Sequence, residues 1–295
     1  MAGSGADEIF AESQRIVRWH YQWIIVHEFL RLTCTQLVVD DVLTNGRKFY
    51  RWRNEPFIPV EFSVAAYRFG HSQVQPSYRA NFSAGTGNTE LFQFIFQAVA
   101  NHSSPEKDDL SGSFRAPWRF IDWQTFFDFK DGKVRNNKKI DTKLSTPLFT
   151  LPGTVVQNPH PKTNPQSLAQ RNLLRHLTFS LPSGQRVARA MKAKVPAIVE
   201  LQEGDLIDLK PHGLHNRTPL WFYILKEAEV LAAGEHLGPV GGRIVAEVFI
   251  GLLQGDPYSY LSQDVDWTPF LPTIDPATTG SDFQMVDLLR FAGVA

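Results

Sequence analysis

The stretch AAYRFGHS, residues 65–72, sets an arginine and a histidine into an otherwise apolar segment. Apolar residues recur at helical spacing from about residue 60 to residue 78, and Pro59 precedes them, as is typical of a helix start. Arg68 and His71 are three residues apart, so on one helix they face the same way. A lone histidine in such a helix is usually structural, and a functional reading of His71 therefore needs a second signal.

A second stretch, QSLAQRNLLR at residues 166–175, supplies that signal. The pair Asn164-Pro165 predicts the start of its helix, with Asn164 as the N-cap and Pro165 in the first turn. Asn172 and Arg175 are again three residues apart. Each of two helices thus presents one cation and one side chain that can bind a metal or orient a ligand.

Two arginines buried together need anions, and a flat cofactor with two carboxylates supplies them. Haem has this shape. The imidazole of His71 would then bind the iron, and the amide oxygen of Asn172 would accept the other ring N–H. The alternative, from the residues alone, is a pair of helices with ordinary surface arginines.

Both stretches resemble motifs of the animal-type haem peroxidases, most closely the bacterial members, and the resemblance runs from about Ala6 to the C-terminus. Residues 67–72 resemble the proximal-histidine motif, and residues 172–182 resemble the segment that carries the proximal asparagine and a propionate-binding arginine. Residues 220–229 and 237–243 resemble the C-terminal helices of the family. The resemblance implies haem b as cofactor. It also implies roles for four residues: His71 as axial iron ligand, Asn172 as its hydrogen-bond partner, and Arg68 and Arg175 as propionate anchors.

The distal residues of the family have no counterpart in this sequence. Peroxide cleavage needs a base that moves a proton between the two oxygens and a cation that stabilises charge. The family takes them from a Gln/Asp-His-Asp-type segment and an arginine-containing helix, both upstream of the part that resembles residues 7–37. His27 and Glu28 do not match the distal motif. No catalytic residue is therefore assigned, and we expect the proximal half of a peroxidase, incomplete on its distal, N-terminal side.

The resemblance implies that the complete form uses hydrogen peroxide to oxidise halides or small organic donors, in keeping with a response to oxidative stress. One alternative is a non-catalytic helical module that holds haem loosely or serves interaction, pairing with a second chain or with itself through an exposed apolar face. Another is a cyclooxygenase-like dioxygenase. That group places a radical-forming tyrosine three residues before the proximal histidine, where this chain has Arg68, and Tyr67 lies one residue too early.

Composition narrows the remaining possibilities. The 295 residues carry 30 basic and 30 acidic side chains, so no overall positive field favours nucleic acid. No uninterrupted apolar run is long enough for a membrane span. The only cysteine, Cys34, has no partner for a disulfide or a thiolate metal cluster. Residues 1–5 are typical of a linker or a cloning remnant and lack the pattern of a signal peptide, which makes the cytoplasm the default compartment.

The helical pattern predicts a mainly α fold in one domain over residues 6–295. One long helix is expected over residues 7–37, and residues 82–164 are expected to be irregular with short helices. Further helices are predicted from Ser183 to about residue 194, from Pro219 to about residue 234, over residues 238–253, and over residues 283–292 with Asp282 as N-cap.

Overall fold

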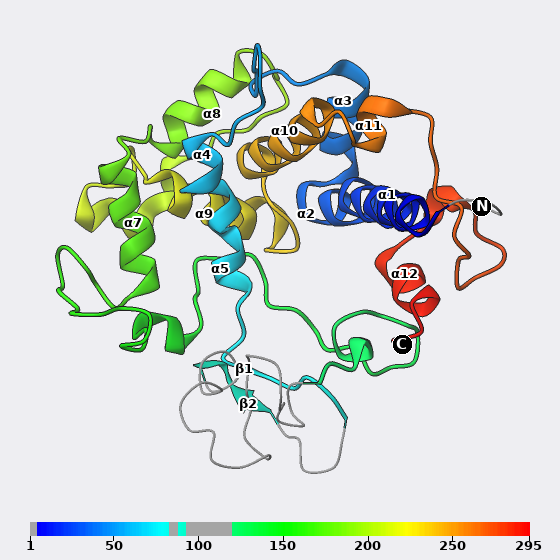
Figure 1. Cartoon of the computed structure of the whole chain (residues 1–295). Helices are drawn as coiled ribbons and strands as arrows, with labels where there is room; N and C mark the ends of the chain where they lie inside the picture. The colour runs from blue at the N-terminus through cyan, green and yellow to red at the C-terminus, as the bar shows by residue number, and fades with distance from the viewer. Residues whose placement is uncertain (1–4, 83–87, 93–119) are drawn as a thin grey trace.

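The computed structural model describes residues 5–82, 88–92 and 120–295, and these residues are mainly helical, as predicted (Figure 1). The elements of the N-terminal part are α1 (Ala6–Ile24), a π-helix η1 (Ile25–Phe29), α2 (Leu30–Cys34), α3 (Gln36–Asn45), α4 (Val60–Ser63), a 3₁₀ helix η2 (Ala66–Phe69), α5 (Gly70–Gln73), β1 (Ser77–Tyr78) and β2 (Thr89–Glu90). The remainder comprises η5 (Trp123–Thr125), η6 (Thr146–Phe149), α7 (Leu168–Thr178), α8 (Gly184–Lys192), η7 (Glu203–His212), α9 (Leu220–Ala232), α10 (Pro239–Gly255), α11 (Tyr260–Gln263), η8 (Gly280–Asp282) and α12 (Met285–Phe291).

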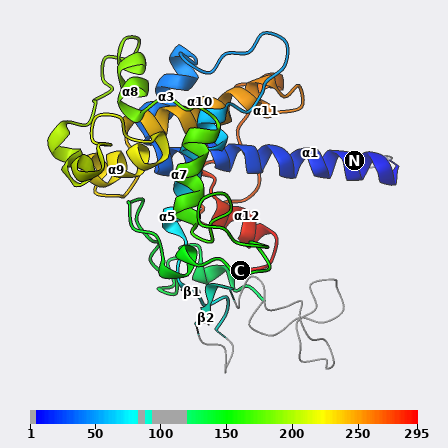
Figure 2. The same cartoon turned by 90° about the vertical axis from the view of Figure 1, so that its left-hand side faces the viewer.

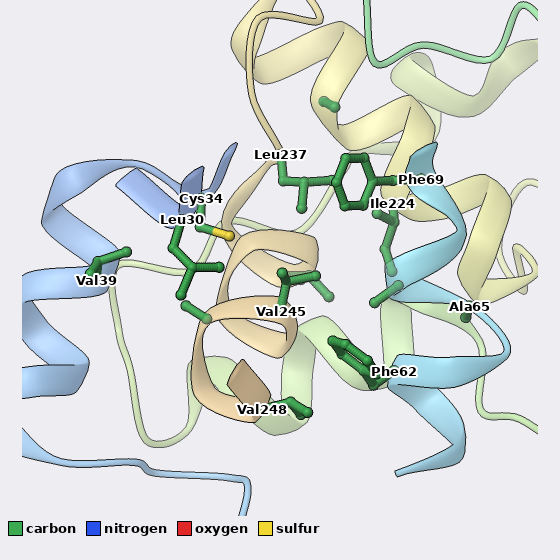
Figure 3. Packing of buried hydrophobic residues seen from close by; sticks show 14 of the residues in the cluster. Leu30, Cys34, Val39, Phe62, Ala65, Phe69, Ile224, Leu237, Val245 and Val248 are labelled. Atoms are coloured by element: carbon green, nitrogen blue, oxygen red, sulfur yellow. The ribbon is translucent and has the colours of Figure 1, made fainter. Parts of the chain in front are cut away.

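Helix α10 lies at the centre of the core and packs against α2, α3 and α9 (Figure 3). Two glycines allow this close approach. A Cβ atom at Gly241 would lie 2.6 Å from the Ile224 side chain, and one at Gly242 would lie 3.2 Å from the Cys34 carbonyl oxygen. The thiol of Cys34 is buried in this contact. Because α9 and α10 are apolar on nearly all sides, they form the layer onto which the other helices pack.

The predicted single helix over residues 7–37 is confirmed as a continuous helical run up to Cys34, three residues before its expected end. The α-helix gives way to π-helical hydrogen bonding at Ile25, and helical structure stops at Thr35, where φ is +74°. A β-branched residue rarely adopts a positive φ, so nothing in the local sequence predicts this break. The N-terminal end of α1 projects beyond the rest of the fold (Figure 2).

The predicted helix over residues 60–78 is divided into α4, η2 and α5, and it ends at Gln73. Ala65, with φ −132° and ψ −75°, interrupts the first turn. The residue before a proline avoids helical angles, so Pro76 helps to end the helix before Gln75. The chain then enters β1, where Ser77 is opposite Glu90 and Tyr78 opposite Thr89 in an antiparallel pair.

Two of the predicted caps are wrong. The N-cap of α7 is Ser167, whose hydroxyl accepts from the N–H of Gln170, whereas Asn164 forms an isolated bridge with His160. Asp282 ends a 3₁₀ helix instead of capping α12. The predicted start of α8 at Ser183 is confirmed, and α9 and α10 lie where they were expected.

The predicted irregular course of residues 82–164 agrees with its described parts, which contain η5 and η6. Most of the apolar cluster at residues 91–99 falls outside the described residues. No helix within residues 5–82, 88–92 and 120–295 has the length and apolar character needed to cross a bilayer.

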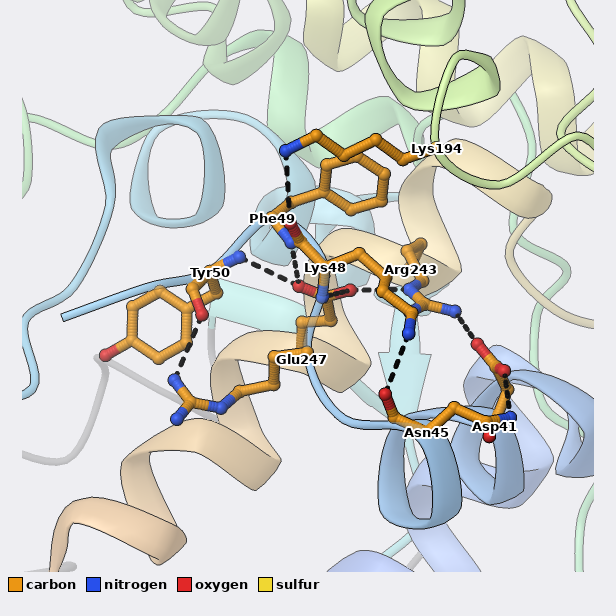
Figure 4. Close-up of polar contacts among 9 residues, drawn as sticks. Asp41, Asn45, Lys48, Phe49, Tyr50, Lys194, Arg243 and Glu247 are labelled. Atoms are coloured by element: carbon orange, nitrogen blue, oxygen red, sulfur yellow. Dashed lines mark hydrogen bonds and ion pairs between the residues drawn. The ribbon is translucent and has the colours of Figure 1, made fainter.

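Glu247 of α10 fixes the segment after α3 through a buried polar network (Figure 4). Its carboxylate accepts hydrogen bonds from the backbone N–H groups of Lys48, Phe49 and Tyr50 at 2.7–2.8 Å. It also accepts one from Nε of Arg243 at 2.6 Å, and Arg243 pairs in turn with Asp41. Since Glu247 and Arg243 are almost fully buried, each charge depends on the other for compensation.

Candidate haem site

His71 and Asn172 are the centre of the candidate site. They come from α5 and α7, and Nδ1 of His71 lies 2.8 Å from Nδ2 of Asn172. Asn172 is 1% exposed, and its buried amide oxygen Oδ1 has no hydrogen-bond partner among the residues that the structure describes. An unpaired amide oxygen next to a ring nitrogen is costly, because a buried acceptor loses its water without gaining a donor.

The orientation of the Asn172 amide decides which nitrogen of His71 is free. With Nδ2 as the donor, Nδ1 accepts, the ring proton is on Nε2, and His71 cannot bind a metal through Nε2. A half-turn of the amide brings Oδ1 to the position where it accepts from Nδ1–H. The lone pair of Nε2 is then available to iron, and the buried oxygen gains a partner. In this second orientation of the Asn172 amide, His71 fits the role of an axial haem ligand. Haem binding would select this orientation.

The charge state of His71 also fits a metal ligand. Burial of the ring, followed by the positive charges of Arg68 and Arg175, lowers the pKa of His71 from 6.5 to about 4. The imidazole is therefore neutral at neutral pH, which is the form that coordinates iron.

Arg68 and Arg175 lie close to each other and to His71. Burial and the nearby charge of Arg175 lower the pKa of Arg68. The side chain of Arg68 donates from Nε to the carbonyl oxygen of Ser63 at 3.0 Å. Within the described part of the chain, neither arginine makes an ion pair. Two half-buried cations without an acidic partner fit a ligand that carries two carboxylates, as haem does.

Helix α9 brings the two halves of the site together, because it packs against both η2 and α7. Trp221, at the start of α9, donates from Nε1 to the carbonyl oxygen of Arg68 at 3.1 Å. Trp221 is a supporting residue that the sequence did not single out, although it lies in a segment with family resemblance. The four predicted site residues are thus neighbours in the fold.

The other histidines have different surroundings. His20 uses both ring nitrogens on the backbone, with Nδ1 2.7 Å from the Ile16 carbonyl oxygen and Nε2 3.3 Å from the N–H groups of Phe270 and Leu271. His215, three residues after His212, lies 3.7 Å from Glu203. Across residues 5–82, 88–92 and 120–295, no three His, Cys, Asp or Glu side chains are grouped so that they could hold a metal ion.

The described residues form a mainly helical fold, and the four predicted site residues lie close together in it. Residues 4–145 match the family model for animal haem peroxidase, a range that includes Arg68 and His71 but not Asn172 or Arg175. This match supports membership of the animal-type haem peroxidase superfamily.

A solved structure, peroxidase A from Dictyostelium discoideum (DdPoxA), has a similar fold. The two chains share 15% sequence identity with a TM-score of 0.52, and the match covers 95% of this chain and 51% of peroxidase A. This chain therefore spans about half the length of that peroxidase. A search of curated proteins found no match.

Proposed function

We propose that this chain carries the proximal side of a peroxidase haem site and binds haem b through His71. The observation that carries the proposal is the contact of 2.8 Å between His71 and Asn172. Among the described residues, the buried amide oxygen of Asn172 lacks a partner, and the two arginines near His71 have no acidic partner. Family membership supports the same cofactor.

Each of the four residues has a separate task. His71 is the neutral axial ligand, and Asn172 accepts its Nδ1 proton and fixes the direction of the ring. An amide leaves the imidazole less anionic than a carboxylate partner would. Arg68 and Arg175 hold the two propionates by charge-assisted hydrogen bonds. Haem, when bound, supplies the redox chemistry by which hydrogen peroxide oxidises halides or small organic donors in the complete form of the protein.

Haem titration followed by absorption spectroscopy tests this proposal. We expect the purified chain to give an imidazole-ligated Soret band that His71→Ala disturbs and that free imidazole restores in this variant. The matched control is His176→Ala, since His176 is also half-buried and lies on α7 next to Arg175. A spectrum that responds equally to both substitutions would exclude His71 as the ligand.

A second candidate function is a non-catalytic helical module that pairs with another chain or with itself. The observation in its favour is apolar exposure along the projecting part of α1, where Phe10 is 68% exposed, Val17 52% and Tyr21 50%. These residues are seven and four positions apart, so they share one face of the helix. Gel filtration with light scattering separates the candidates. A dimer that Val17→Glu dissociates, together with no His71-dependent haem spectrum, favours the module.

A further inference from the structure

Tyr260 of α11 and His27 of the π-helix η1 form a phenol–imidazole pair, in which the phenol is buried and the imidazole half-buried. The Tyr260 hydroxyl lies 3.2 Å from Nε2 of His27, although 233 residues separate the two in sequence. Tyr260 is 1% exposed. Helix α11 contacts α1, and the hydroxyl of Tyr260 reaches His27 on the π-helical turn η1. Single π-turns within helices occur frequently at functional sites.

Aromatic rings surround this pair. The ring of Trp23 is stacked on His27, with centroids 3.7 Å apart and an angle of 17° between the planes. Trp267 lies 5.7 Å from Tyr260 and 6.1 Å from Trp23, measured between ring centroids. Trp19 extends the group with an edge contact to Trp267 at 5.4 Å. Indole and phenol rings are the side chains that lose an electron most readily, so this cluster is suited to hold an oxidising equivalent.

The same residues line a cavity of about 260 Å³. Trp23, His27, Tyr260 and Trp267 form much of its wall, and Gln254 and Asp266 add polar groups. A small cavity with aromatic walls and a few polar groups suits a small aromatic molecule. Such a molecule would lie in contact with the rings of the pair.

The chemistry of phenol oxidation explains why the imidazole matters. A phenol that loses an electron becomes a strong acid, so its oxidation is favourable only where a base accepts the proton. His27 can be that base, since burial and the charge of Arg31 keep its ring neutral. Tyr223 is an internal contrast: it is equally buried, but its hydroxyl accepts from the Leu201 N–H, and no histidine of the described segments is bonded to it.

We propose that Tyr260 and His27 are a redox-active pair that passes single electrons from a phenolic donor in the adjoining cavity to a one-electron oxidant. In the first step Tyr260 loses one electron to the oxidant, and its proton moves to Nε2 of His27, leaving a neutral tyrosyl radical beside an imidazolium. In the second step the donor gives up one electron and its hydroxyl proton. The electron and the His27 proton restore Tyr260, and the donor proton passes to solvent.

In its physiological form the inference rests on the proposed function, because the oxidant would be one derived from peroxide. Tyr67, next to Arg68, lies close enough to Tyr21 for that residue to contribute to the raised pKa of the Tyr67 phenol, after burial of the ring. Tyr21 and Trp23 are two residues apart on α1 and lie on different faces of it, so an electron would cross this helix to reach the pair.

The test uses the full chain without haem, so failure of the haem site and failure of the pair are distinguishable. Photogenerated tris(bipyridine)ruthenium(III) oxidises the protein, and freeze-quench electron paramagnetic resonance detects tyrosyl radicals. All samples carry Tyr21→Phe, Tyr67→Phe and Tyr258→Phe, because these exposed tyrosines would otherwise react first. We expect a long-lived tyrosyl signal that decreases several-fold in Tyr260→Phe but not in the matched control Tyr223→Phe.

The role of His27 is measured in two ways. His27→Gln keeps a hydrogen-bond acceptor but removes the base, so the radical yield should fall several-fold and the solvent deuterium isotope effect should disappear. On the chain with native His27, ¹⁵N-labelled histidine should produce a hyperfine coupling to the radical, a readout that needs no stable variant. A tyrosyl yield that is unchanged in Tyr260→Phe, or a radical without coupling to histidine nitrogen, would overturn the proposal.

The donor cavity is tested with p-cresol as the probe. It should shorten the lifetime of the Tyr260 radical, and Val265→Trp should reduce this effect several-fold. Val265 lines the cavity and is 70% exposed, so a larger side chain there fills the cavity without disturbing the core. Equal quenching in both proteins would show that the donor does not act from the cavity.

Discussion

Asn172 and His71 are 101 residues apart in sequence, yet Nδ2 and Nδ1 of their side chains lie 2.8 Å apart at a buried contact between α7 and α5. His71 must be neutral and correctly oriented if it is to bind iron. The amide of Asn172 can hold one nitrogen of its ring and so fix that orientation. The first prediction concerns this amide.

Asn172→Leu preserves the approximate volume of the side chain and removes its hydrogen bond. Loss of an outer hydrogen bond to a metal ligand costs about 10- to 100-fold in affinity, and we expect haem binding to weaken by this amount. Asn172→Asp should instead lower the reduction potential of bound haem, because a carboxylate makes the imidazole more anionic. Haem titration and spectroelectrochemistry measure the two effects. Identical potentials for the chain and Asn172→Asp would contradict the assigned role.

Removal of either arginine should weaken haem binding through the propionates. A hydrogen bond to a charged group contributes about 1.5–3 kcal/mol, so Arg68→Ala and Arg175→Ala should each reduce affinity by about one to two orders of magnitude. Haem dimethyl ester, which has no free carboxylates, is the control ligand. If the arginines anchor propionates, the ester should bind all three proteins with similar affinity. An equal loss for haem and its ester would point to a packing role.

Stability should decrease in mild acid. Burial and cationic neighbours lower the pKa of His71 from 6.5 to about 4, and burial with Arg31 lowers the pKa of His27 to a similar value. Between about pH 6.5 and pH 4, the unfolded chain takes up protons at these positions and the folded chain does not, so the free energy of unfolding falls as the pH falls. Above about pH 6.5 both states hold neutral rings and this contribution is fully present.

Urea unfolding at a series of pH values measures this dependence. His71→Gln should reduce the slope between pH 6.5 and 4, because one of the groups that take up protons on unfolding is gone. The control is His212→Gln, which makes the same substitution at an exposed histidine. A slope that does not respond to His71→Gln would show that this ring titrates equally in both states.

Disruption of the Glu247 network should destabilise the fold strongly. Glu247→Leu leaves Arg243 buried without one of its two carboxylate partners and three backbone N–H groups without an acceptor. Loss of one partner of a buried ion pair costs about 3–5 kcal/mol. The matched control is Glu235→Gln, which removes an exposed pair with Lys139 and should change stability by about 0–1 kcal/mol. Chemical denaturation measures both, and a small loss in Glu247→Leu would indicate that water replaces the carboxylate.

Local sequence was sufficient where a structural feature depends on neighbours along the chain. The capping serine at Ser183 and the apolar character of α9 and α10 predicted these helices, because a cap bond and a helical turn each involve residues a few positions apart. The spacing of Asn172 and Arg175 likewise followed from the geometry of α7, whereas Arg68 and His71 lie in two consecutive short helices, η2 and α5. Family resemblance joined the two pairs into one expected site.

Tertiary packing decided what local preference could not. Asn164 is a good capping residue, but it pairs with His160, and Ser167 caps α7 in its place. Thr35 adopts a positive φ that its own side chain disfavours, because the chain there turns from α2 into α3, and both helices pack against α10.

The long-range polar pairs have the same origin. Packing of η2 and α7 on α9 brings His71 to Asn172, and packing of α11 on α1 brings His27 to Tyr260. The sequence by itself determined which chemical groups each helix carries and at what spacing. Only the tertiary structure decided which of them meet, because burial of the apolar faces around α9 and α10 sets the distances between helices far apart in the chain.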